Sequence, residues 1–128
     1  MLKPHEPLDR AEHLVSEAIK AGADAADAVY VCDASTEVQV RLGALEDVAR
    51  SEGEEIGLRV FVGQRSATIS SSSLNPAILS NLVTRAIDMA KEAPEDQYAG
   101  LAPQDRLLKA EAPDLDVDDG QDPDPALL

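Results

Sequence analysis

Aromatic side chains are scarce in this sequence of 128 residues, which contains no tryptophan, two tyrosines and one phenylalanine. The core must therefore be built from alanine, valine, leucine and isoleucine, which are among the residues most often buried. Proteins that hold single-stranded nucleic acid commonly stack the bases on aromatic rings. The sequence lacks the residues for such a platform, and its length fits one domain with tails.

Cysteine is represented by Cys32 alone, which excludes an internal disulfide and is compatible with a reducing compartment. Cys32 lies in an apolar run with no histidine near it, so we expect a buried, unreactive thiol. No apolar run approaches the roughly 18 residues of a membrane span, and the N-terminus has no apolar segment typical of a secretory signal. We therefore expect a cytoplasmic protein that does not bind membranes.

Basic residues are outnumbered, with 11 Lys and Arg against 25 Asp and Glu and a net charge of −14. Residues 92–128 contain eleven acidic and two basic residues, so most of the excess charge lies in the tail. This balance argues against binding to phosphate backbones. We interpret the tail as a solvated linker. The alternative is a free-standing acidic interaction module whose tail mimics nucleic acid or binds a basic partner.

The clearest structural pattern lies in residues 55–74. Four apolar residues recur at every second position, as in a strand with one buried face: Ile56, Leu58, Val60 and Val62. Residues 63–65 (GQR) interrupt the run, and alternation resumes over residues 66–70. This pattern predicts a β-hairpin with a short turn that contains glycine.

An amphipathic helix is predicted on each side of the strands. The first covers Asp9–Ala21, with its N-cap at the first of these residues and Gly22 just beyond its end. The second follows the N-cap Asn75, has Pro76 at its first helical position and ends before Pro94. Its apolar stripe is expected to face a sheet: Leu79, Leu82, Val83, Ala86, Ile87 and Ala90.

Three more strands are predicted between the first helix and the hairpin. Asp27–Asp33 is apolar and β-branched, which is typical of a strand buried on both faces. Thr36–Leu42 alternates clearly, and Leu45–Ser51 is a weaker returning strand, with turns at residues 43–44 and 52–54. The order α-β-β-β-β-β-α predicts an α+β two-layer sandwich, with a mainly antiparallel sheet of about five strands and two helices on one face.

The same reading divides the chain into three parts. Residues 1–8 are expected to be disordered, and residues 9–102 to form the α+β domain. Residues 103–128 are acidic and rich in proline, and we expect a linker towards a missing following domain, with one short helix around residues 104–110.

Three patterns suggest chemistry without completing it. His5 and His13 lack the i, i+4 spacing of a helical zinc site. No nucleophile-elbow motif surrounds Ser70–Ser73. A third group has calcium-loop spacing, although Pro125 stands where a bidentate glutamate is required: Asp114, Asp116 and Asp118. We therefore assign no catalytic, cofactor-binding or metal-ligating residue to this chain.

Three arginines are candidates for an interaction face. If Arg41, Arg59 and Arg65 share the exposed face of the sheet, they could bind an acidic peptide or a partner. The alternative is that they are solvated partners of nearby acids: Glu37, Glu46 and Glu55.

Several of these stretches together resemble the first domain of the TldD/PmbA family, most strongly its PmbA (TldE) branch. The resemblance is carried by RLGALEDVARSEGEEIGLRVFVGQRSATISSSSL at residues 41–74 and, after an amphipathic helix, by APEDQYAGLA at residues 93–102. AGADAADAVY at residues 21–30 and APDLDVDDG at residues 112–120 fit the same pattern. The similarity thus covers about residues 10–120.

The resemblance implies a subunit of a two-protein metallopeptidase, a hydrolase in which a PmbA-like chain pairs with a TldD-like chain to process peptides in an internal chamber. It places the zinc motif HExxxH in the TldD-like partner, so zinc is expected there and no cofactor in this chain. This sequence would be the non-catalytic N-terminal domain, truncated from a longer protein. The older name "modulator of DNA gyrase" also attaches to the family, but the acidic charge argues against direct contact with DNA.

Overall fold

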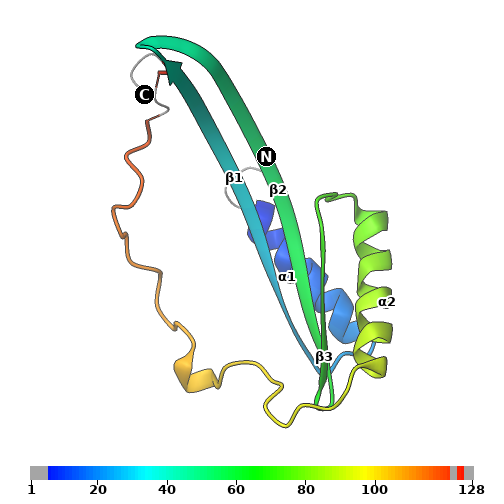
Figure 1. Cartoon of the computed structure of the whole chain (residues 1–128). Coiled ribbons are helices and arrows are strands. Elements are labelled where there is room, and N and C mark those ends of the chain that lie inside the picture. The colour runs from blue at the N-terminus through cyan, green and yellow to red at the C-terminus, as the bar shows by residue number, and fades with distance from the viewer. Residues whose placement is uncertain (1–5, 122–123, 126–128) are drawn as a thin grey trace. The chain divides into compact units, whose positions relative to one another are not determined.

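A computed structural model describes residues 6–121 and 124–125 of the chain. The fold is α+β, with two helices and a three-stranded antiparallel sheet in the order α-β-β-β-α (Figure 1). A short 3-10 helix follows in the tail. The elements are α1 (Glu6–Lys20), β1 (Ala25–Arg41), β2 (Ala44–Val62), β3 (Arg65–Ser71), α2 (Pro76–Glu92) and η1 (Gln104–Arg106).

The chain divides into two compact units. The first consists of the residues up to Asp33 together with Gly53–Leu101, and it holds both helices, β3 and the adjoining parts of β1 and β2. The second consists of Ala34–Glu52 and the residues from Ala102 onward.

The sheet has β2 at its centre, in the order β1-β2-β3. Strands β2 and β3 pair antiparallel, so that Leu58 lies opposite Ile69, Gly57 opposite Ser70 and Arg59 opposite Thr68. Because side chains alternate between the two faces of a strand, this register assigns Leu58 to one face and Gly57 and Arg59 to the other.

The prediction of about five strands was wrong, because two pairs of predicted strands are continuous. Strand β1 runs through Ala34-Ser35, and β2 runs through Gly53. These residues permit a turn but do not force one, and Gly53 has no positive φ. A Cβ atom at Gly53 would lie 3.0 Å from Asp33 Oδ1, so the glycine allows close contact with β1 and does not mark a chain reversal.

Both predicted helices are present. Helix α1 ends in a Schellman motif, in which Gly22 (φ 111°) donates to the Ile19 carbonyl at 3.1 Å and Ala23 to the Ala18 carbonyl at 3.0 Å. At the start of α2, the Asn75 side chain accepts a hydrogen bond from the Ala77 amide at 2.9 Å, with proline at the first helical position. These capping predictions are confirmed.

The start of α1 is corrected. The helix begins at Glu6, three residues before the predicted N-cap Asp9, so residues 6–8 are helical where disorder was expected. Pro7 does not prevent this, because a proline in the first turn removes an amide that has no helical partner. The expected disorder of residues 1–5 lies outside the described residues.

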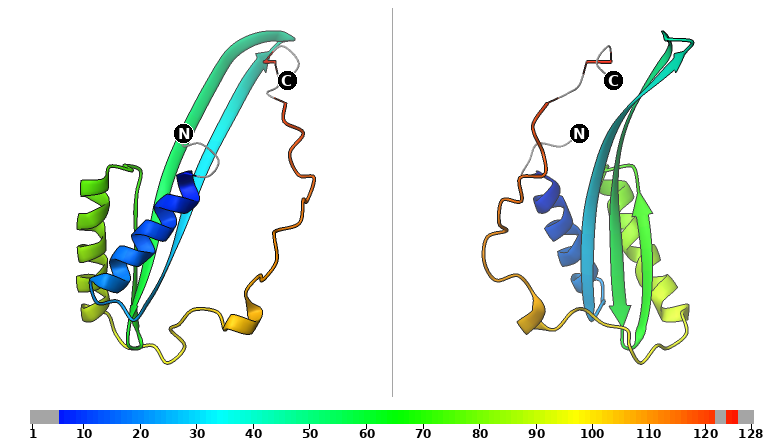
Figure 2. Two further views of the ribbon diagram at one scale, coloured as in Figure 1. Left: turned by 180° about the vertical axis from the view of Figure 1, so that it is seen from behind. Right: turned by 60° about the vertical axis from the view of Figure 1, so that its left-hand side comes forward.

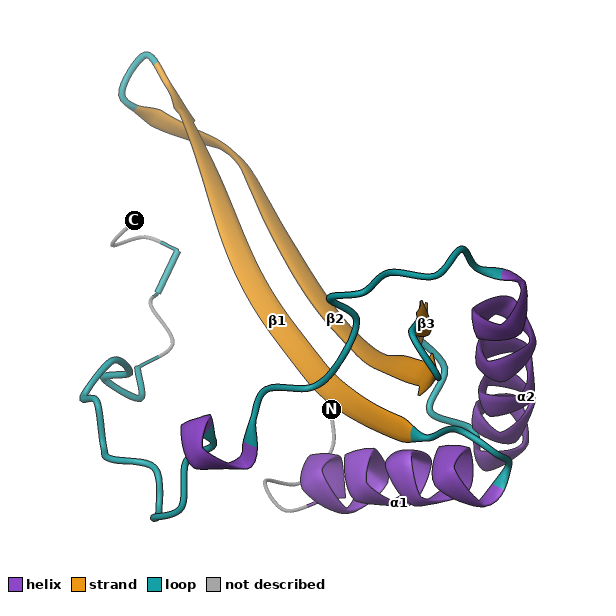
Figure 3. Ribbon diagram, turned by 90° about the horizontal axis from the view of Figure 1, so that it is seen from below, coloured by secondary structure: helices purple, strands orange, loops and turns teal. Residues whose placement is uncertain are grey.

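The core of the first unit lies between the two helices and one face of the sheet, here called the inner face. Ile56, Leu58 and Val60 of β2 are 0% exposed, and the six predicted stripe residues of α2 are all buried against the same cluster as Leu14 and Ala18 of α1. Figure 2 shows both helices on one side of the sheet, and Figure 3 shows them meeting beside it. Glu17 of α1 accepts a hydrogen bond from Ser80 of α2 at 3.0 Å.

The second unit has little buried surface among its described residues. Its hairpin reverses at Leu42 and Gly43, with φ angles of 52° and 77°, one residue earlier than the predicted turn at 43–44. The left-handed conformation is usual for glycine and uncommon for leucine, whose side chain is fully exposed here. In the tail, the helix predicted around residues 104–110 is reduced to the three residues of η1.

Candidate functional site

The candidate site is the sheet face opposite the helices, here called the outer face, in the first unit. It is formed by every second residue of the three strands. Two contacts fix this assignment for β1: Asp27 pairs with Arg59, and a Cβ atom at Gly57 would lie 3.4 Å from Val29 Cγ1. The outer face thus includes Asp27, Val29, Val31 and Asp33 of β1, Glu55, Gly57 and Arg59 of β2, and Thr68 and Ser70 of β3.

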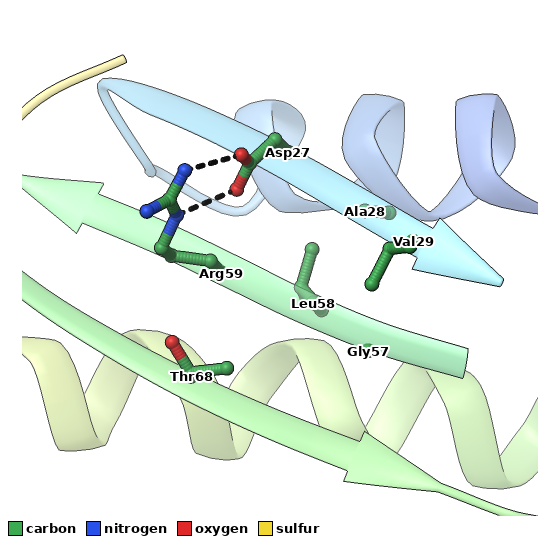
Figure 4. A pocket seen from close by; sticks show the side chains of 7 residues that line it. All are labelled: Asp27, Ala28, Val29, Gly57, Leu58, Arg59 and Thr68. Atoms are coloured by element: carbon green, nitrogen blue, oxygen red, sulfur yellow. Dashed lines mark hydrogen bonds and ion pairs between the residues drawn. The ribbon is translucent and has the colours of Figure 1, made fainter. Parts of the chain in front are cut away.

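Arg59 and Asp27 form a two-pronged ion pair on this face. Arg59 Nε donates to Asp27 Oδ1 at 2.9 Å, and Nη2 donates to Oδ2 at 2.5 Å (Figure 4). The guanidinium also lies 5.2 Å from the centroid of the Phe61 ring, within the range of a cation–π contact. The hydrogen bond to Asp27 raises the pKa of Arg59 above its usual value. The guanidinium therefore stays charged at neutral pH, and its charge is matched by a carboxylate.

Beside this pair lies a hollow of about 340 Å³ centred on Gly57. It is lined by Val29 of β1, Thr68 of β3 and the Arg59–Asp27 pair, together with Ala28 and Leu58 (Figure 4). Val29 is 59% exposed, so an apolar side chain is presented to solvent at the edge of the hollow. A glycine inside a strand makes a protein less stable than an alanine would, by about 0.5–1 kcal/mol. Such a glycine often marks a place where another group approaches the backbone closely.

Acidic and hydroxyl groups lie further along the same face. Glu55 accepts a hydrogen bond from the hydroxyl of Ser70, which stands opposite Gly57. A second hollow, of about 540 Å³, is lined by these two residues together with Val31, Asp33, Gly53, Glu54 and two further serines. The carboxylates give this end of the outer face a negative charge, whereas the Arg59 end is neutralised by Asp27.

The structure does not bring the three predicted arginines together. Arg59 lies on the outer face, but Arg41 lies in the second unit, where it pairs with Glu46 at 3.3 Å. Arg65 donates to the Lys91 carbonyl at the end of α2 at 2.6 Å and lies 3.7 Å from Glu95. Among the described residues, Arg41–Glu46 is the one ion pair that joins one of these arginines to an acid predicted as its partner.

Two expectations about β1 are corrected. Cys32 is exposed, where a buried thiol was expected. Val29 and Val31 are 59% and 53% exposed, where a strand covered on both faces was expected. Val29 and Val31 are exposed because they lie on the outer face, which the described helices of the first unit do not cover. Cys32 alternates with them and so lies on the inner face, but it is not among the residues that pack against the core there. A run of β-branched residues predicts a strand but does not show what covers it.

His13 lies on α1, and His5 lies outside the described residues. Ser70 and Ser71 end β3, and Asp114 and its neighbours form local turns in which their carboxylates accept from main-chain amides two residues on. Over residues 6–121 and 124–125, no group of three or more His, Cys, Asp or Glu side chains is placed to hold a metal ion. No helix in that same portion is long and apolar enough to cross a bilayer.

Sequence reasoning missed Gly57 and Asp27 as parts of the site. A signal for Gly57 was available, since it interrupts the second face of a strongly alternating strand. No comparable signal marks Asp27, because its partner Arg59 lies 32 residues away and only the sheet brings them together.

Comparison with known proteins gives a consistent result. The profile of PmbA/TldA metallopeptidase domain 1 matches residues 26–90, which include most of β1, all of β2 and β3, and α2 almost to its end. A metalloprotease PmbA homolog from Haemophilus influenzae is 35% identical over 103 residues, covering 80% of this chain and 22% of the relative. The metalloprotease PmbA of Escherichia coli O157:H7 is 31% identical over 109 residues, covering 83% of this chain and 24% of the relative.

The fold is also found in a crystal structure from Bacteroides thetaiotaomicron, whose description proposes a modulator of DNA gyrase. The two structures superpose with a TM-score of 0.78 at 24% identity, over 89% of this chain and 25% of the other. At that identity the match concerns the fold. The chain therefore spans about a quarter of the length of the proteins that it matches.

Proposed function

The chain belongs to the PmbA/TldD metallopeptidase family as its domain 1, and from this membership we propose that it is a non-catalytic part of a peptide-processing assembly. In this proposal a PmbA-like subunit works with a TldD-like subunit, and the zinc and the hydrolytic chemistry reside in the latter. The present residues contribute a surface. The observation that carries the proposal is the family match over residues 26–90, which contains the whole outer face described above.

The structure supports a binding role through the outer face. The outer face presents Val29, at 59% exposure, and Val31, at 53%, beside a hollow, and exposed apolar groups next to a concavity are common in binding surfaces. The described residues do not offer zinc a ligand set, so no step of the proposed function passes through a metal in this chain. Direct contact with nucleic acid is not part of the proposal, because the net charge is −14.

The test uses the full-length subunit pair and a matched pair of substitutions. Val29→Asp introduces a charge on the outer face, and Ile78→Asp introduces one on α2 at a site of similar exposure, 45%. We expect Val29→Asp to lower the kcat/KM of peptide cleavage by about tenfold or more, which corresponds to about 1.4 kcal/mol. Ile78→Asp should leave it unchanged, and circular dichroism should show that both variants are folded.

Two results would contradict the proposal. One is peptide cleavage by this chain alone, which would make it catalytic. The other is equal activity of the Val29→Asp, Ile78→Asp and unmodified pairs, which would remove the outer face from the function. Deleting residues 104–128 tests the acidic-module alternative, because loss of partner binding on that deletion would favour the tail over the folded unit.

A further inference from the structure

Gly57 is a glycine that this fold does not need. Its φ angle is not positive, so its backbone conformation is open to any residue. A Cβ atom there would meet only Val29, at 3.4 Å from Cγ1 and 3.9 Å from the carbonyl oxygen, which is ordinary contact. Gly53 differs, because a Cβ atom there would lie 3.0 Å from Asp33 Oδ1. A Cβ atom at Gly53 would thus require the exposed Asp33 side chain to turn aside, whereas packing within the chain leaves Gly57 unexplained.

The missing side chain at Gly57 opens a slot at the centre of the sheet. Val29 and Thr68 stand on either side, and the Arg59–Asp27 pair closes one end (Figure 4). Because the hollow is about 340 Å³ and its walls are largely apolar, it has room for an aliphatic side chain. The charge of Arg59 is matched by Asp27, so this end of the slot does not favour an anion.

The other end of the slot is acidic. Glu55 lies two residues from Gly57 along β2, on the same face, and Asp33 of β1 lines the neighbouring hollow with it. Neither carboxylate has an ion-pair partner within the described part of the chain. Residues i and i+2 of an extended chain lie about 6.6–7 Å apart. The same spacing separates Gly57 from Glu55 along β2. A ligand that lies along β2 would therefore present its second side chain to these acids.

We propose that the Gly57 slot binds the aliphatic side chain of an extended peptide segment, and that a lysine or arginine two residues along that peptide pairs with Glu55 and Asp33. The inference rests on the proposed peptide-processing function and specifies a class of peptide for it. Charge complementarity favours a basic side chain of the peptide opposite Glu55 and Asp33, and the apolar slot favours an aliphatic side chain. The peptide lies over the outer face along β2, and the proposal does not require its cleavage at this position.

The experiment titrates the 128-residue chain, labelled with ¹⁵N, with three synthetic peptides. The test peptide is acetyl-Ser-Leu-Ser-Lys-Ser-amide, and in the two matched peptides leucine is replaced by serine or lysine by glutamate. We expect the test peptide to shift the amide signals of Val29, Gly57 and Ser70. Each matched peptide should bind more weakly by at least about tenfold. Raising the salt concentration should weaken the binding of the test peptide, which depends on its lysine. It should hardly change the ratio between the affinities of the test peptide and of the peptide with serine in place of leucine.

Variants of the chain locate the binding. Gly57→Val fills the slot, and we expect it to weaken the test peptide by about tenfold or more. If that variant fails to fold, Glu55→Gln with Asp33→Asn decides the question, because it should abolish the preference for lysine over glutamate. Asp88→Asn on α2 is the control for loss of a carboxylate and should retain that preference.

The inference is overturned if the test peptide causes no shifts on the outer face at millimolar concentration, or if Gly57→Val and the double variant bind all three peptides as the original chain does. The proposed function is tested separately from the peptide inference. If peptide binding is absent here while Val29→Asp still impairs cleavage by the subunit pair, the outer face contacts the partner subunit, and only the peptide inference fails.

Discussion

The two faces of β2 differ in what their side chains do, although they alternate along one strand. Ile56, Leu58 and Val60 point to the inner face and are 0% exposed, packed against α1 and α2. Glu55, Gly57 and Arg59 point to the outer face, where they form an acidic end, a slot and a matched ion pair. The inner face can be explained by folding alone. The outer face has a glycine and exposed valines for which folding gives no reason, and these features led to the binding proposal.

The largest effect should come from a cavity on the inner face. Leu58→Ala removes a side chain that is 0% exposed, so we expect the free energy of unfolding to fall by about 2–5 kcal/mol. Val29→Ala, on the outer face, should change it by no more than about 0.5 kcal/mol. Urea denaturation followed by circular dichroism measures both. Similar losses at the two positions would mean that the outer face is also part of the folded core.

A smaller effect of opposite sign is expected at the slot. Gly57→Ala should raise the free energy of unfolding by about 0.5–1 kcal/mol, because alanine restricts the unfolded chain and its Cβ atom fits at 3.4 Å from Val29. Gly53→Ala should raise it by less, since its Cβ atom would lie 3.0 Å from Asp33 Oδ1 and that exposed side chain would have to turn aside. Thermal unfolding compares the two. A loss of stability at Gly57 would show that the fold itself requires this glycine, and the slot would lose its main argument.

The sequence predicted the inner face better than the outer face. Helix α2 depends on local signals, namely the cap at Asn75, the proline after it and a stripe of apolar residues, and all of these are found as expected. The period-2 alternation over residues 56–62 likewise identified the buried side of β2. Such patterns reflect contacts that each element needs in order to bury its own apolar side.

The errors concern properties that local sequence does not determine. Ala34-Ser35 and Gly53 permit both a turn and an extended strand, so the number of strands depended on pairing across the hairpin. The exposure of Cys32 and Val31 depends on whether another layer covers β1. Arg59 was placed on an exposed face, but its partner Asp27 is distant in sequence. These features are set by tertiary neighbours.

The smallest expected effect concerns the ion pair at the end of the slot. A double-mutant cycle with Asp27→Asn and Arg59→Gln should give a coupling energy of about 0.2–1 kcal/mol, since both side chains are nearly half exposed. The corresponding cycle for Arg41 and Glu46, which share one contact at 3.3 Å, should give less. Equal couplings would show that the two-pronged geometry adds nothing to stability.

The pH and salt dependence sharpen this last prediction. A base whose pKa is raised on folding contributes stability below its unfolded-state pKa and loses it only as pH rises through the folded-state value, so Arg59 should support the pair at all moderately alkaline pH values. The coupling should fall between 0.1 M and 1 M NaCl, as the screening length drops from about 10 Å to about 3 Å. A coupling energy that persists in high salt would mean that the hydrogen bonds to Asp27 and the contact with Phe61 hold Arg59 in place. In that case the ion pair would act as a rigid wall of the slot, in addition to neutralising the charge of Arg59.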